Sequence, residues 1–204
     1  MDKYVYLKEN SIPNELCDDI IEYYYENKDY HYDGETHSGV NKDVKDTSDF
    51  LIPTNVEVNS KWHKINKFLY KELHDNLKNY LNALQNKPEY LFPNNVTDYK
   101  LFDINYFTDK VFMIQKYEKQ KGKYIYHNDF SLKENSYRVI TFLWYLNDVE
   151  EGGETEIWNE LKIKPEKGKL LLFPSHWSVP HCGKMPISSD KIIITGWLYK
   201  NIKI

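Results

Sequence analysis

The sequence predicts an α+β fold that is mainly β, with helices in the first half of the chain and strands in the second. Apolar residues between Trp62 and Leu84 recur at helical spacing. From residue 111 onward, short apolar runs alternate with turn-forming Gly, Asn and Asp. A chain of 204 residues suits one domain with a substantial core. We therefore expect one domain over residues 1–204, with a helical support region at 1–110 and a β-rich region at 111–204.

Composition and charge exclude several classes of partner. The formal net charge of −4 leaves no basic footprint for nucleic acid and no polybasic patch for a membrane surface. No apolar run approaches the roughly 20 residues that cross a bilayer, and the first residues lack the apolar segment of a secretory signal. Two cysteines, Cys17 and Cys182, do not make a disulfide framework. We expect a cytoplasmic protein without nucleic-acid or membrane partners; the oligomeric state stays open.

The N-terminal half is predicted to contain one strand, two helices and a loop. Residues 1–10 alternate apolar and polar side chains, as a short strand does. Pro13 suits the first turn of a helix, and helically spaced apolar residues follow it. Residues 30–50 are polar, and we expect a long, mobile surface loop there. The second helix carries an apolar stripe that should pack on a sheet: Trp62, Ile65, Phe68, Leu69, Leu73, Leu77, Tyr80, Leu81 and Leu84.

The β-rich half is predicted to contain seven strands separated by turns. Asn147-Asp148 and Gly152-Gly153 supply turn chemistry between them, and the two glycines are typical of a hairpin. The expected strands are Val111–Tyr117, Tyr124–His127, Arg138–Leu146, Thr155–Trp158, Lys169–Phe173, Ser178–Cys182 and Lys191–Leu198.

The sequence His127-Asn128-Asp129, together with the distant His181, predicts a metal site. Residues two apart on an extended chain point to the same side, so a strand end can present His127 and Asp129 to one ion. Two imidazoles and one carboxylate occupy one face of a divalent iron and leave the opposite face open. His176 competes as the distal ligand, but it lies in a turn beside Pro174, so we expect it to be exposed or behind the ligands.

Lys191 is the second unusual residue, because it begins the apolar run Ile192-Ile193-Ile194. A cation that enters an apolar interior is costly unless it meets an anion. Tyr117 lies ten residues before His127, and its hydroxyl can donate to the same anion. A zinc hydrolase would use similar metal ligands, but it gives no reason for Lys191 and Tyr117 at these spacings.

Several motifs in order resemble one family. Over residues 111–199, the chain resembles the prolyl 4-hydroxylase-like branch of the iron(II)- and 2-oxoglutarate-dependent dioxygenases. A looser similarity covers Ile12 to Cys17, which looks like the opening helix of that family. The matching stretches are Ile114-Gln115-Lys116-Tyr117, His127-Asn128-Asp129, Tyr145-Leu146-Asn147-Asp148, Gly152-Gly153-Glu154-Thr155, Phe173-Pro174-Ser175, and His181 through Lys191 to Gly196-Trp197.

The resemblance implies a fold and a metal. The fold is a double-stranded β-helix, a jelly-roll or cupin-like core buttressed by the N-terminal helices. His127, Asp129 and His181 would bind iron(II). Molecular oxygen and 2-oxoglutarate would complete the reactants, with ascorbate as a candidate reductant.

The resemblance also implies cosubstrate residues. Lys191 would pair with the far carboxylate of 2-oxoglutarate, with help from Tyr117 and Thr195. Many small-molecule oxygenases of the superfamily use arginine at the position of Lys191. Arg138 is the one arginine among 27 basic residues, and it is expected either to form an ion pair or to contact substrate. Trp197 either lines the pocket or packs in the core.

The implied activity is hydroxylation of a C–H bond, with release of succinate and CO2. The expected substrate is a prolyl residue in a peptide or protein. A free amino acid or other small molecule is an alternative substrate. A non-catalytic binding module on the same scaffold is a further alternative, although such a module need not keep the three metal ligands and Lys191.

Overall fold

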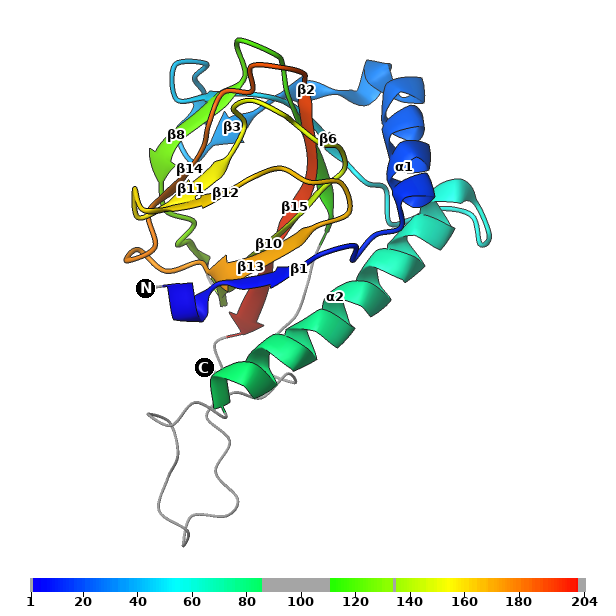
Figure 1. Cartoon of the computed structure of the whole chain (residues 1–204). Helices are drawn as coiled ribbons and strands as arrows, with labels where there is room; N and C mark the ends of the chain where they lie inside the picture. The colour runs from blue at the N-terminus through cyan, green and yellow to red at the C-terminus, as the bar shows by residue number, and fades with distance from the viewer. Residues whose placement is uncertain (1, 86–110, 134, 202–204) are drawn as a thin grey trace, which may run out of the picture.

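A computed structural model of the chain describes residues 2–85, 111–133 and 135–201. Two antiparallel sheets face each other and enclose a barrel, and two long helices lie outside it (Figure 1). Neither of these helices has an apolar stretch long enough to cross a membrane. A single domain over residues 1–204 stays a prediction, because residues 86–110 of the expected support region lie outside the described residues.

The larger sheet is built around the long strands β10 and β15, which pair antiparallel along most of their length. The short strand β9 (Leu132–Lys133) pairs with β10 beside it. In spatial order, the sheet contains β1 (Tyr6–Lys8), β13 (Leu170–Pro174), β10 (Ser136–Tyr145), β15 (Lys191–Asn201), β7 (Met113–Tyr117), β6 (Ser48–Leu51) and β2 (Tyr32–Asp33).

The smaller sheet closes the other side of the barrel, and a separate hairpin of β3 (Glu35–Thr36) and β4 (Gly39–Val40) lies nearby (Figure 1). Two facing antiparallel sheets of this kind form a double-stranded β-helix, as predicted. All seven strands expected after residue 111 are confirmed, with ends shifted by a few residues. The smaller sheet contains β12 (Leu161–Ile163), β11 (Thr155–Ile157), β14 (His181–Gly183), β8 (Lys123–His127) and β5 (Lys45–Asp46).

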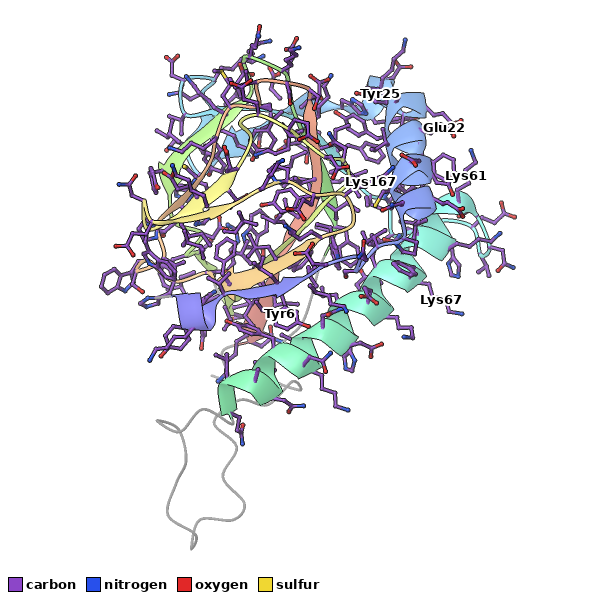
Figure 2. All side chains as sticks on the ribbon, viewed as in Figure 1. Tyr6, Glu22, Tyr25, Lys61, Lys67 and Lys167 are labelled. Carbon is purple, nitrogen blue, oxygen red and sulfur yellow. The ribbon has the colours of Figure 1, made fainter. Side chains whose placement is uncertain are left out.

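The two long helices, α1 (Asn14–Glu26) and α2 (Lys61–Gln85), cover the outer face of the larger sheet (Figure 1). Short 3-10 turns, η1 (Asp2–Tyr4) and η2 (Lys28–Tyr30), precede β1 and follow α1. Ser60 caps α2, because its Oγ accepts a hydrogen bond from the His63 backbone N–H at 3.3 Å. The predicted apolar stripe of α2 is confirmed as a surface packed on the sheet. Lys61 and Lys67 point away from the sheet into solvent (Figure 2).

Alternation along β10 divides the apolar residues between two cores. Phe142 and Trp144 pack with the helices outside the sheet. Leu143 and Tyr145 point to the other face and pack inside the barrel. The larger sheet is therefore buried on both faces, which explains why its central strands are almost continuously apolar in sequence.

The segment 30–50, predicted as a surface loop, instead contains five short strands. Strand β6 extends the larger sheet beside β7, and β5 extends the smaller sheet beside β8. Within this segment, His31 is half-buried and stacks on Tyr24 with ring centroids 3.9 Å apart. Strands of two to four residues are too short to show alternation, so the polar composition was misleading. The predicted mobility of this segment stays a prediction.

Candidate metal centre

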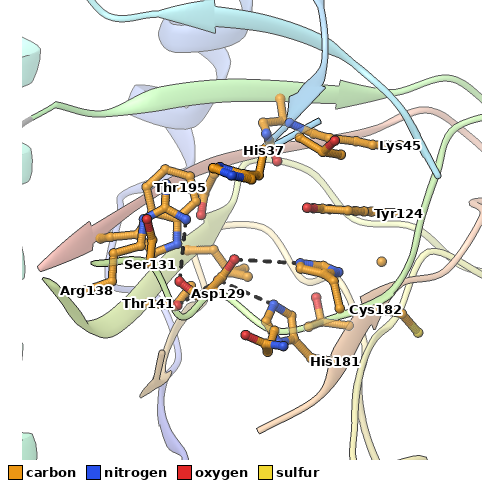
Figure 3. Close-up of a pocket in the computed structure, with 18 of the residues that line it drawn as sticks. His37, Lys45, Tyr124, Asp129, Ser131, Arg138, Thr141, His181, Cys182 and Thr195 are labelled. Atoms are coloured by element: carbon orange, nitrogen blue, oxygen red, sulfur yellow. Dashed lines mark hydrogen bonds and ion pairs between the residues drawn. The ribbon is translucent and has the colours of Figure 1, made fainter. Parts of the chain in front are cut away.

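Three candidate ligands come together at one end of the barrel. His127 is the last residue of β8, Asp129 follows two residues later, and His181 begins β14. Because β8 and β14 pair, His181 lies directly opposite His127 in the ladder. One ligand atom from each of the three residues lies within 4.8 Å of the others (Figure 3). The structure thus gathers the three residues that the sequence singled out.

Backbone carbonyls orient both imidazoles. The Nδ1 atom of His127 lies 2.8 Å from the Ile125 carbonyl oxygen, and that of His181 lies 3.0 Å from the Val179 carbonyl. A carbonyl oxygen only accepts, so each Nδ1 carries a hydrogen, and in the neutral ring each Nε2 has a free lone pair. The two Nε2 atoms point at Asp129, at 3.7 Å from Oδ1 for His127 and 3.4 Å from Oδ2 for His181.

The Asp129 carboxylate is buried and is oriented by a hydrogen bond from a neighbouring strand. Thr141 donates its hydroxyl hydrogen to Oδ2 at 2.8 Å, and the Thr141 oxygen lies 2.8 Å from the Ser175 hydroxyl. Burial alone would raise the pKa of Asp129, but His181, His127 and the Thr141 hydrogen bond outweigh it and hold this pKa well below its usual range. Asp129 is therefore a carboxylate at any physiological pH.

The two histidines differ in their protonation. Burial, and then the neighbouring charge of His181, lower the pKa of His127 to about 4. Burial also opposes the charge on His181, but the Asp129 carboxylate outweighs it and raises the pKa of His181. At neutral pH, His127 is neutral and can donate its Nε2 lone pair at once, whereas the raised pKa of His181 favours a proton with which a metal ion would compete.

Lys191 lies inside the barrel, on the strand beside Tyr117, and its side chain is 1% exposed. Its ammonium donates to the Gly153 carbonyl at 2.9 Å and lies 3.9 Å from the centroid of the Tyr117 ring. Gly153 has a φ of +76°, a conformation that favours glycine and that aims this carbonyl inward. Lys191 forms no ion pair with any side chain in the described part of the chain. Burial lowers the pKa of Lys191 to about 7.

One cavity of about 830 Å3 contains both groups. His127, Asp129 and His181 form part of its wall, and Lys191 and Tyr117 lie in the same wall. A buried cation without an anionic partner, in a cavity shared with a metal-ligand set, fits a ligand that carries its own carboxylate.

Thr195 lines the same cavity but is already engaged. Its hydroxyl donates to the Phe142 carbonyl at 2.8 Å. A hydroxyl has one hydrogen, so Thr195 has none left to donate to a carboxylate in this arrangement. The predicted assistance from Thr195 is therefore not supported by this geometry. His176 is exposed, as expected, and is not part of the ligand group.

Arg138 faces the cavity instead of pairing with an acid. Its guanidinium lies 3.5 Å from the centroid of the Trp197 ring, and both residues line the cavity. Figure 3 shows Arg138 beside Ser131 and Thr141. It also donates to the Tyr199 hydroxyl at 3.4 Å and to the Asp129 carbonyl at 3.5 Å. Within the described ranges, no ion pair includes Arg138. Of the two roles predicted for Arg138, the ion pair is absent from the described residues. The position of Arg138 in the cavity wall is compatible with a substrate contact.

Two residues that support the ligands were missed by the sequence reasoning. Thr141 holds the Asp129 carboxylate, and Tyr124 stacks on His127 with ring centroids 3.5 Å apart and an interplanar angle of 13°. Tyr124 lies three positions before His127, a spacing that should place the two side chains on opposite faces of a regular strand. The β8–β14 ladder is irregular at this point, because two residues of β8, Ile125 and Tyr126, lie opposite one residue of β14, Cys182. Such a bulge re-aims side chains, and no local pattern reveals it.

The β-rich half of the chain is similar in sequence to known proteins. Residues 112–199 match the family described as the 2OG-Fe(II) oxygenase superfamily. The matched residues contain the three candidate ligands and Lys191. "Probable prolyl 4-hydroxylase 10" of Arabidopsis thaliana is 32% identical over 114 residues, and "Probable prolyl 4-hydroxylase 3" is 31% identical over 115. The matches cover 41% and 42% of this chain but only 38% of each relative. The resemblance to prolyl 4-hydroxylase-like oxygenases is confirmed.

Solved structures share the fold of the β-rich half and its helices. A viral collagen prolyl hydroxylase from Paramecium bursaria Chlorella virus-1, in a 2OG complex, has a TM-score of 0.64 at 17% identity, covering 97% of this chain and 96% of that one. A Trichoplax adhaerens prolyl hydroxylase, in complex with a hypoxia inducible factor peptide fragment, has a TM-score of 0.69 at 20% identity, covering 97% and 84%. These likenesses confirm the double-stranded β-helix.

Proposed function

We propose that this chain is an iron(II)- and 2-oxoglutarate-dependent dioxygenase that hydroxylates a prolyl residue in a peptide or protein. The observation that carries the proposal is the pairing of two features in one cavity. His127, Asp129 and His181 can share one ion, and the buried ammonium of Lys191 needs an anion. A non-catalytic binding module has no need of this combination, and a zinc hydrolase has no need of the buried lysine.

Each residue then has a defined task. The two Nε2 atoms and the Asp129 carboxylate would hold iron(II), as this donor set does in non-haem oxygenases. Lys191 neutralises the far carboxylate of 2-oxoglutarate, and Tyr117, whose ring centroid lies 3.9 Å from the ammonium, donates its hydroxyl hydrogen to the same carboxylate. Iron(II) bound there would couple oxidative decarboxylation of 2-oxoglutarate to C–H hydroxylation, giving succinate and CO2.

The rim of the cavity supports a polypeptide substrate over a free amino acid. Phe130 and Leu132 line the cavity, and Leu132 is 65% exposed. Trp177, also 65% exposed, lies beyond His176, whose ring is 6.4 Å from that of Phe130. Clustered exposed apolar side chains next to a cavity are typical of a surface that binds a partner chain. A free amino acid bound inside the cavity would leave this rim unused.

A mass-spectrometric assay tests the proposal. Wild-type protein with iron(II), 2-oxoglutarate and ascorbate is incubated with proline-containing peptides and, separately, with free amino acids. We expect peptides to gain the mass of one oxygen atom, with an equal amount of succinate. Oxygen gain on free amino acids alone would replace the peptide substrate by a small molecule. Metal-dependent peptide cleavage without succinate would contradict the proposal and favour the hydrolase.

Replacement of Arg138 by lysine should raise the KM for the peptide substrate. A guanidinium can grip a peptide carbonyl with two parallel N–H groups and stack on Trp197 at once, and an ammonium cannot do both. We expect a loss of about 1–2 kcal/mol, roughly a tenfold rise in KM. Succinate formation without substrate should be unchanged. An equal fall in this uncoupled rate would show that Arg138 supports the metal centre instead.

The affinity for 2-oxoglutarate should fall as pH rises above 7. Burial lowers the pKa of Lys191 to about 7, and a bound carboxylate would raise it again. Below pH 7, the free protein already carries the ammonium. Above pH 7, binding must take up a proton, so affinity falls by up to about tenfold per pH unit. Calorimetry in buffers of different ionisation enthalpy should detect this uptake; binding without proton exchange would contradict the role of Lys191.

A further inference from the structure

A buried ion pair lies beside the same cavity, with its lysine, Lys45, in the cavity wall. The ammonium of Lys45 lies 2.6 Å from Asp49 Oδ2, and the two side chains are 4% and 1% exposed. Thr47 donates to Asp49 Oδ1 at 2.7 Å, and Gln115 donates to Oδ2 at 3.0 Å. Both Lys45 and Gln115 line the cavity. Buried ion pairs rarely stabilise a fold more than apolar residues of the same size, so stability alone does not account for this pair.

The pair joins the two sheets at the end of the barrel that carries the metal ligands. Lys45 is on β5 of the smaller sheet, and its partner across the ladder is Tyr124 on β8. Asp49 is on β6 of the larger sheet, and its partner across the ladder is Gln115 on β7. The Lys45–Asp49 contact therefore links β8, which ends at His127, to the opposite wall of the barrel.

Tyr124 connects this pair to the metal centre. The Lys45 ammonium lies 5.6 Å from the centroid of the Tyr124 ring. At this distance the face of an aromatic ring attracts a cation. The Tyr124 ring in turn stacks on the His127 imidazole at 3.5 Å between centroids. A hydrogen bond to the Ile125 carbonyl fixes one edge of that imidazole, and the Tyr124 ring restricts its rotation.

We propose that Lys45 and Asp49 are positioning residues, whose ion pair holds Tyr124 against His127 and thereby sets how tightly the metal centre binds its ion. The inference rests on the proposed function, because it assumes that His127 is a metal ligand. Lys45 does not touch the ligand group itself; it acts through the tyrosine. An apolar pair would fill the space without fixing the orientation of that ring.

Binding of cobalt(II), a redox-stable substitute for iron(II), tests the inference. We expect Lys45→Met to weaken cobalt binding to the apo-protein by about 10–100-fold, the usual effect of removing a group that orients a metal ligand. The double variant Lys45→Met/Asp49→Leu removes both charges and so avoids an unpaired buried ion. It should show the same loss while its melting temperature stays close to that of the wild type. Lys71→Met, in the exposed Lys71–Asp75 pair, is the matched control and should have no effect.

Variants of Tyr124 show whether the pair acts through that ring. Tyr124→Phe keeps the stacked ring and should bind cobalt with wild-type affinity. Tyr124→Leu removes the ring and should bind cobalt more weakly. In the Tyr124→Leu background, Lys45→Met should cause no further loss, because the two residues act in series. Additive losses, or cobalt affinity unchanged in the folded double variant, would overturn the inference. A rise in peptide KM with unchanged cobalt affinity would also overturn it. If the Lys45→Met/Asp49→Leu variant fails to fold, the double-mutant cycle of Lys45→Met and Tyr124→Leu tests the inference by itself.

The wild-type titration separates this inference from the proposed function. Wild-type protein that binds no cobalt at the ligand group would contradict the proposed metal centre itself. Wild-type protein that binds cobalt tightly, alongside variants that bind it equally well, would contradict only the positioning role.

Discussion

His181→Ala should abolish iron(II) binding and turnover. It removes one of three donors from a buried site, and His176, five residues earlier, is exposed and outside the ligand group. Removing a group that merely orients a ligand costs about 10–100-fold in metal affinity, so loss of a ligand should exceed about 100-fold. Equilibrium dialysis of iron(II) under anaerobic conditions and succinate release measure the two effects.

His176→Ala is the matched control for this experiment, since it removes an imidazole from the same connection between β13 and β14 without touching the ligand group. It should bind iron(II) as the wild type does. His127→Ala should behave like His181→Ala. Retained turnover in either ligand variant would place the metal elsewhere and remove the basis of the proposed function.

Lys191→Met should weaken 2-oxoglutarate binding by about 2–5 kcal/mol, or at least roughly 30-fold, and leave iron(II) affinity nearly unchanged. Removing one partner of a buried, hydrogen-bonded charge pair carries a cost of this size. Methionine fills most of the space of the lysine, so no large cavity is left behind. The variant should also be no less stable without cosubstrate, because the buried ammonium has no anionic partner among the described residues.

Lys169→Met provides the comparison for a buried lysine distant from the metal site. Lys169 is 6% exposed and pairs with Glu166 and Glu9, so its loss should lower stability while 2-oxoglutarate binding stays intact. Calorimetric titration of each variant with 2-oxoglutarate, in the presence of iron(II), measures the difference. Equal weakening of iron(II) and 2-oxoglutarate in Lys191→Met would indicate a folding role for this lysine.

The fold of the β-rich half was predictable because its strands are long enough to show their pattern. Strand β15 is a run of apolar residues from Ile192 onward, and β10 is similarly apolar. Glycine and asparagine separate the strands with recognisable turns. Strands β2 to β6 were missed for the opposite reason: each spans two to four residues, and burial of Lys45 and Asp49 depends on their mutual contact. Local composition carries no signal for such a pairing.

The candidate site was predictable only at the level of residue type and spacing. His127, Asp129, His181 and Lys191 stood out because they are chemically conspicuous at distinctive intervals. The groups that orient them did not, since Thr141 and Tyr124 are ordinary strand residues whose contacts arise from strand pairing and from the irregular β8–β14 ladder. Thr195 was expected to face the cosubstrate, but a backbone carbonyl of the neighbouring strand takes its hydrogen bond.

The most direct measurement is the absorption spectrum of the apo-protein titrated anaerobically with iron(II) and 2-oxoglutarate. A keto acid that chelates iron(II) at this site should give a weak charge-transfer band in the green region. The band should saturate at one iron per chain, vanish in His181→Ala, and require more 2-oxoglutarate in Lys191→Met. Absence of the band in the wild type, with zinc bound tightly at the same residues, would contradict the account.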